Sequence, residues 1–107
     1  MTYPPTTGEA VPDTTTLEAL RRVVAAQIGP REPGVIYETS VSAYEVLAVV
    51  RDPQRARELL GRRCAQWAAI VRDIFRPDAE PFAIGTVWTT SDRLIRSADV
   101  AHRAARR

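Results

Sequence analysis

The spacing of apolar residues predicts a first helix over residues 16–28. Thr15 and Glu18 stand three positions apart at its start, as in a capping box, where each side chain satisfies a free backbone N–H. Gly29 and Pro30 follow the last apolar residue and end the helix. The apolar residues recur at intervals of three and four, which places them on one helical face. They are Leu17, Leu20, Val24 and Ile28.

Two short segments have the composition of strands, and a short helix is predicted between them. Residues 35–41 alternate apolar and polar side chains and are rich in β-branched and aromatic residues. Residues 82–89 again combine β-branched and aromatic side chains. Ser42 and Glu45 match a second capping box, which predicts a short helix through Val50.

A long helix is predicted over residues 52–75. Asp52 suits the N-cap, Pro53 suits the first helical position, and Pro77 lies beyond the end. Apolar residues follow one face at steps of four and three. This spacing fits a stripe that packs on the chain's own core, and it also fits a seam between the helices of two copies. The residues predicted for this core stripe or self-association seam are Leu60, Cys64, Trp67, Val71 and Ile74.

A last helix is predicted over residues 92–105, in the basic half of the chain. Residues 1–50 carry a net charge of −3 and residues 51–107 a net charge of +5. The arginines of this helix and its end could contact nucleic acid or an acidic protein partner. They also suit a solvated face, since acids precede arginines by four positions. They are Arg93, Arg96, Arg103, Arg106 and Arg107.

Together these elements predict one small α+β domain that is dominated by helices. Four helices and two short strands follow in the order α-β-α-α-β-α over residues 14–107. Residues 1–13 are rich in Thr, Pro and Gly and are expected to form a flexible N-terminal arm. A length of 107 residues, with 45% hydrophobic and 26% charged, is typical of a single soluble domain.

The composition also bears on the source and location of the protein. All fifteen basic residues are arginine, alanine is abundant, and lysine and asparagine are absent, as GC-rich codons would produce. We therefore expect a high-GC bacterium or one of its phages. The longest apolar runs are too short to cross a bilayer, and the N-terminus lacks the basic and apolar regions of a secretory signal. The expected location is the cytoplasm.

No residues have the spacing of a catalytic, cofactor-binding or metal-binding site. One cysteine excludes a disulfide framework, and one cysteine with the single His102 cannot form a structural zinc site. Asp99 lies three residues before His102, but arginines surround the pair, and we expect a solvated histidine. The five glycines match no phosphate-binding loop. We therefore expect neither an enzyme nor a bound cofactor.

The sequence favours a small non-enzymatic protein that acts by protein–protein interaction or assembly. It would serve as a regulatory partner or a structural subunit, either as a homo-oligomer or bound to another protein. The arginine-rich half, with its positive charge, leaves one alternative open. In that alternative, the chain is a nucleic-acid-binding regulator that uses the arginines of the last helix.

Overall fold

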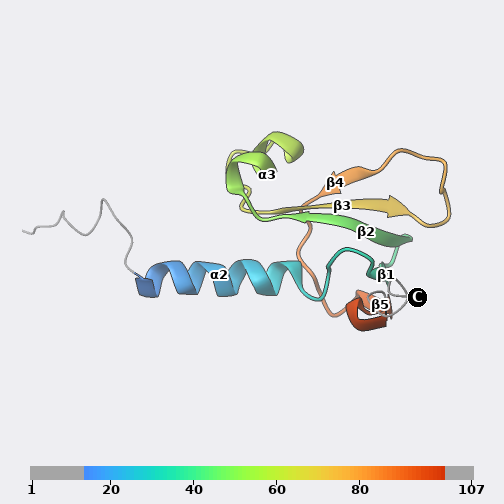
Figure 1. Cartoon of the computed structure of the whole chain (residues 1–107), viewed down its shortest axis with the longest axis horizontal. Coiled ribbons are helices and arrows are strands. Elements are labelled where there is room, and N and C mark those ends of the chain that lie inside the picture. The colour runs from blue at the N-terminus through green and yellow to red at the C-terminus, as the bar shows by residue number, and fades with distance from the viewer. Residues whose placement is uncertain (1–13, 101–107) are drawn as a thin grey trace, which may run out of the picture.

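The computed structural model describes residues 14–100 of the chain, and within them five strands form one antiparallel sheet (Figure 1). The elements are α2 (Thr14–Ile28), β1 (Ile36–Glu38), β2 (Ala43–Val50), α3 (Pro53–Leu60), β3 (Ala68–Asp73), β4 (Phe82–Ile84) and β5 (Arg93–Arg96). Four strands lie side by side in chain order, and the fifth returns to pair with the first, which gives the order β4-β3-β2-β1-β5. The linker over residues 85–92 therefore connects the two edges of the sheet.

Several predicted elements are confirmed at least in part. The first helix is present as α2 and begins two residues earlier than predicted. The two predicted strands are present as β1 and β4, each shorter than expected. Helix α3 begins at Pro53 with Asp52 at the N-cap, although the Asp52 side chain makes no capping hydrogen bond. Proline at the first helical position is sufficient to mark this start.

Residues 43–50 form strand β2, so the short helix predicted there is wrong. The segment is rich in valine, which favours a pleated and half-buried surface. Glu45 fits a capping box in the sequence, but in the structure its carboxylate spans the sheet. It accepts hydrogen bonds from Arg72 on β3 at 2.8 Å and from Arg96 on β5 at 3.3 Å. Strand pairing and burial outweigh the local capping signal.

The long helix predicted over residues 52–75 is also wrong, because α3 ends at Leu60. Gly61 follows in the left-handed conformation with φ 65°, and its N–H donates to the carbonyl of Arg57 at 2.8 Å. Glycine adopts this conformation at little cost and ends the helix. After a turn the chain forms β3, in which Ala69 and Val71 are buried. The regular apolar spacing thus spans two different elements and does not mark one helical face.

The helix predicted over residues 92–105 is wrong at its start, where the chain forms the edge strand β5. Arg93 donates to Glu38 at 2.7 Å and Arg96 donates to the carbonyl of Gly34 at 2.8 Å, which fix the strand beside β1. Residues 98–100 are helical. The rest of that predicted helix and the predicted arm over residues 1–13 lie outside the described residues.

The predicted fold class is therefore corrected. The described chain contains helices of 15 and 8 residues beside a five-stranded sheet. It is an α+β fold built around an antiparallel sheet, and the helix-dominated order α-β-α-α-β-α with four helices is contradicted. The error has one source, because three segments with helix-start signals are strands for part of their length.

The core lies on one face of the sheet, beneath the linker over residues 85–92. Tyr37, Val46 and Val71 are buried on neighbouring strands. The ring of Trp88, from the linker, lies 5.5 Å from that of Tyr37 between centroids. The opposite face carries the ion pairs of β5 with β1 and β2. The last turn of α2 enters the core side, and the remainder of α2 extends away from the strands (Figure 1).

Candidate functional site

Helix α2 is joined to the sheet at its C-terminal end by Arg31, which is only 2% exposed. Its Nε donates to the carbonyl of Ile28 at 2.8 Å, and its Nη2 donates to the carbonyls of Gln27 at 2.8 Å and Thr86 at 2.6 Å. The carbonyls of the last helical turn have no partner within the helix itself. Arg31 therefore caps α2 and connects it to the linker between β4 and β5.

Three aromatic rings enclose the same guanidinium. The Cζ atom of Arg31 lies 5.5, 5.0 and 5.7 Å from the ring centroids of Tyr37, Trp67 and Trp88. Trp67 Nε1 donates to the side-chain oxygen of Gln27 at 3.0 Å, and the backbone N–H of Trp88 donates to the carbonyl of Gln27 at 2.8 Å. Ring faces attract a cation, and their bulk excludes water. A positive charge is thus buried here with backbone carbonyls as its acceptors.

Beyond this joint, α2 presents apolar residues to solvent. All side chains of residues 15–23 are exposed, and three of them are large hydrophobics. Leu17 is 39% exposed, Leu20 44% and Val23 51%. A helix of this length is marginal in water without tertiary contacts. Contiguous apolar patches on a soluble protein mark interaction surfaces, so this face of α2 is our candidate docking surface.

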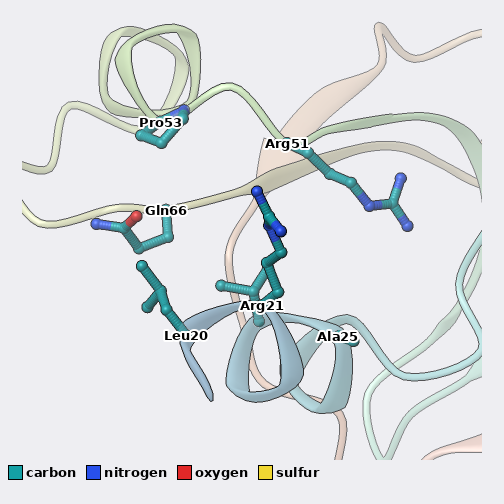
Figure 2. Close-up of a pocket in the computed structure, with 7 residues that line it drawn as sticks. Leu20, Arg21, Ala25, Arg51, Pro53 and Gln66 are labelled. Atoms are coloured by element: carbon teal, nitrogen blue, oxygen red, sulfur yellow. The ribbon is translucent and has the colours of Figure 1, made fainter. Parts of the chain in front are cut away.

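A groove of about 450 Å³ adjoins the candidate docking surface in the middle of α2 (Figure 2). It is lined by Leu20, Arg21, Val24 and Ala25 from α2 and by Arg51, Pro53 and Gln66 from the segments that flank α3. In Figure 2 the side chain of Arg21 extends from α2 toward the opposite wall, where Arg51 and Gln66 lie. Most of the lining is apolar, and the two arginines are its charged groups.

The two arginines of the groove have no carboxylate partner among residues 14–100. The ion pairs of that range use other arginines, namely Arg72, Arg93 and Arg96, with Glu38 and Glu45. Arg51 is exposed, and Arg21 is exposed on α2. An apolar wall beside guanidinium groups that have no carboxylate partner among the described residues suits an occupant that combines apolar and carboxylate side chains.

Comparison with known proteins finds no matching family model, no matching curated protein and no matching solved structure. Within residues 14–100, no helix has the length and apolar character needed to cross a bilayer. The same residues bring together no group of three or more His, Cys, Asp or Glu side chains that could hold a metal ion. Function is therefore inferred from the geometry of α2 and its groove.

A second hollow, of about 320 Å³, lies between the core face of the sheet and the linker. The ring centroids of Tyr37 and Tyr44 are 5.8 Å apart, and those of Tyr44 and Phe82 are 5.9 Å apart. Burial raises the pKa of Tyr37 above its ordinary value of 10.0, against the opposing effect of the hydrogen bond and charge of Arg31. Because Tyr37 also encloses Arg31, we assign this hollow to the packing that supports α2.

The five residues predicted for self-association do not share a surface. Trp67 and Val71 are buried in the chain's own core. Cys64 is exposed in the turn after α3, Leu60 ends α3, and Ile74 follows β3. The structure thus buries two of the five within the chain's own core and places the other three on separate segments. The exposed apolar residues of α2 lie outside this predicted set.

The structure separates the arginines that were predicted to contact nucleic acid or an acidic partner. Arg93 and Arg96 lie on β5, and each is ion-paired with a carboxylate of the same sheet. Arg103, Arg106 and Arg107 lie outside the described residues, as does His102. The two described arginines therefore have a structural partner already.

Sequence reasoning did not find Arg31 or the groove. Arg31 stands in a segment that reads as a turn, and arginine is the only basic residue type in the chain, so nothing distinguishes it. The stripe on the first helix was found, but a pattern does not show whether the chain itself covers the stripe. Pro53 and Gln66 form the far wall only because β2 and α3 return the chain to α2.

Proposed function

We propose that this protein is a small assembly protein that associates with copies of itself through α2. The observation that carries the proposal is the exposure of Leu17, Leu20 and Val23 on a helix that is fixed at its other end. Because Arg31 holds the last turn, α2 presents its apolar face in one direction. Docking to such a preorganised helix orders little additional backbone, which lowers the entropic cost of association.

The form of the groove supports a protein segment as its occupant. Leu20 belongs both to the groove and to the exposed face of α2, so the two surfaces are continuous. Pockets for small molecules typically enclose most of the ligand surface. A groove that opens onto an exposed helix instead suits a second helix, which would cover both surfaces at once.

The native mass of the chain tests this proposal. Light scattering on a sizing column should give a multiple of 11.9 kDa for the wild type. Leu20→Arg adds a third positive charge to the groove and should reduce the mass to that of one chain. Ala19→Arg is the matched control and should keep the wild-type mass, because residue 19 lies about 100° around the helix from Leu20, away from the groove. A wild type of 11.9 kDa at every concentration would overturn the proposal.

One observation supports the alternative of a nucleic-acid-binding regulator. Arg57, Arg62 and Arg63 line a shallow hollow beside Gly61, with Glu58 among them. None of these arginines has an ion pair within residues 14–100. The ratio of absorbance at 260 and 280 nm in the same sizing peak tests this alternative. A peak that carries nucleic acid and releases it as salt rises would favour this function over self-assembly.

A further inference from the structure

We propose that two copies pair through α2 in an antiparallel, two-fold arrangement, in which Leu17 of each copy enters the groove of the other. This inference rests on the proposed function, because it specifies the partner surface and geometry of self-association. A two-fold interface uses the same patch on both copies, so the patch must complement itself. The exposed face of α2 meets this requirement in both its apolar spacing and its charges.

The apolar residues of α2 are spaced for an antiparallel pair. At 100° per residue, Leu17, Leu20 and Val24 fall within about 60° of one another around the helix. With the two-fold axis between positions 20 and 21, Leu17 of one copy lies opposite Val24 of the other, and the two Leu20 side chains meet at the centre. Leu17 then reaches the groove beside Val24 and Pro53, which line it. The pair forms a seam of three apolar layers.

The charges on α2 favour the same arrangement. Glu18 and Arg21 lie on one flank of the apolar stripe, about 60° apart. In an antiparallel helix pair equal flanks face each other, so Glu18 of each copy comes beside Arg21 of the other. The carboxylate also approaches a groove whose opposite wall carries Arg51. Two symmetric ion pairs would thus neutralise arginines that have no carboxylate partner among residues 14–100.

A parallel pair lacks this complementarity. In a parallel arrangement opposite flanks of the two helices face each other. The flank with Glu18 and Arg21 would then meet the flank with Val23. Glu18 of one copy would then face no arginine of the other copy's α2, and the groove arginines would gain no carboxylate partner from the part of α2 that the structure describes.

Cysteine cross-linking of the full chain tests the antiparallel register. Cys64 is exposed, so every variant also carries Cys64→Ser. A disulfide forms only when the two Cα atoms lie within about 4.4–6.8 Å, so mild oxidation reports proximity. The single variants are Leu17→Cys, Leu20→Cys and Val24→Cys, and the matched control on the outer side of α2 is Ala19→Cys.

The antiparallel register predicts a distinct pattern on a non-reducing gel. Leu20→Cys alone should shift from 11.9 kDa to twice that mass. Leu17→Cys alone, Val24→Cys alone and the Ala19→Cys control should remain single chains. An equimolar mixture of Leu17→Cys and Val24→Cys should form the covalent dimer. Circular dichroism confirms that each variant is folded. If Val24→Cys is not folded, linkage of Leu20→Cys to itself without linkage of Leu17→Cys to itself still separates the antiparallel pair from a parallel one.

Three outcomes would overturn the inference, and they separate it from the proposed function. Linking of Leu17→Cys to itself as rapidly as Leu20→Cys would show a parallel pair. A dimeric mass by light scattering without any linkage on α2 would show that the copies assemble through another surface. A wild type with the mass of one chain would refute the proposed function and this inference together.

Discussion

The guanidinium of Arg31 donates to the carbonyl of Thr86, 55 positions later in the chain, at 2.6 Å. The same nitrogen donates to Gln27 in the last turn of α2. One side chain therefore connects α2 to the linker that spans the sheet. The direction in which α2 presents its apolar face depends on this connection.

Replacing Arg31 with lysine should lower the free energy of unfolding by about 2–4 kcal/mol. Lysine keeps the charge, but its single nitrogen on a flexible stem cannot reproduce the planar fork that reaches three carbonyls. Urea unfolding monitored by tryptophan fluorescence measures the loss, because Trp67 and Trp88 enclose the site. Arg22→Lys, at an exposed position of α2, is the control and should change stability by less than about 0.5 kcal/mol. Equal stability of the two variants would contradict the role given to Arg31.

Gly29→Ala and Gly61→Ala separate backbone strain from packing. Both glycines have φ 65°, a conformation that an added Cβ disfavours. At Gly29 the Cβ would also lie 2.5 Å from Cγ of Trp88, whereas at Gly61 nothing lies within 4 Å. We expect Gly61→Ala to lower the free energy of unfolding by about 1 kcal/mol and Gly29→Ala by about 3 kcal/mol. Similar losses of stability in thermal or urea unfolding would mean that the Trp88 ring shifts to accommodate the added Cβ without lowering the free energy of unfolding further.

The stability of the fold should decrease above pH 10 because of Tyr37. Its pKa in the folded state is raised above 10.0, chiefly by burial. Above pH 10 the unfolded tyrosine loses its proton while the folded one keeps it, so the free energy of unfolding falls by up to about 1.4 kcal/mol per pH unit. Above the higher pKa of the folded state this loss is complete and no longer grows. Tyr37→Phe should reduce this decrease in urea titrations between pH 9 and pH 11.5. Tyr44→Phe is the matched control, and an equal effect of both variants would assign the decrease to another group.

Exchanging the charges on α2 should break and then restore the self-association. Glu18→Arg and Arg21→Glu each place like charges together across the two-fold axis, and each should weaken dimerisation about 3- to 10-fold. The double variant Glu18→Arg with Arg21→Glu recreates the ion pairs and should recover most of the affinity. Sedimentation equilibrium at low and high salt measures these constants, and the differences should shrink as salt rises. A double variant weaker than both single variants would argue against the proposed contact.

The helix boundaries show which parts of the fold can be predicted from local sequence. Gly29 and Pro53 mark the end of α2 and the start of α3, since each acts through its own backbone geometry. The match at Ser42 and Glu45 failed because Glu45 pairs with arginines 27 and 51 positions away. Gly61 lies inside the helix predicted over residues 52–75, yet its positive φ ends α3. Strand pairing between distant segments thus decided the error at residues 43–50, whereas the backbone conformation of one glycine shortened α3.

Only the part of the candidate site that lies on α2 could be predicted from the sequence. The stripe of Leu17, Leu20 and Val24 follows from helical periodicity, and the structure leaves its N-terminal part exposed. The other wall, with Pro53 and Gln66, depends on how β2 and α3 return toward α2. Arg31 joins α2 to the linker through backbone carbonyls, and no sequence motif marks the residues that supply them. These relations are tertiary, so periodicity and capping signals do not reveal them.

The connection between Arg31 and Thr86 also orders the events of synthesis. Helix α2 is synthesised before Trp67, Thr86 and Trp88, on which its anchor depends. Contacts of such high sequence separation form late in folding. An incomplete nascent chain cannot yet hold α2 in its final direction, although it already contains the exposed apolar residues of that helix. In the dimer that we propose, the apolar face of α2 therefore takes its binding direction only after the residues of this anchor have been synthesised and folded.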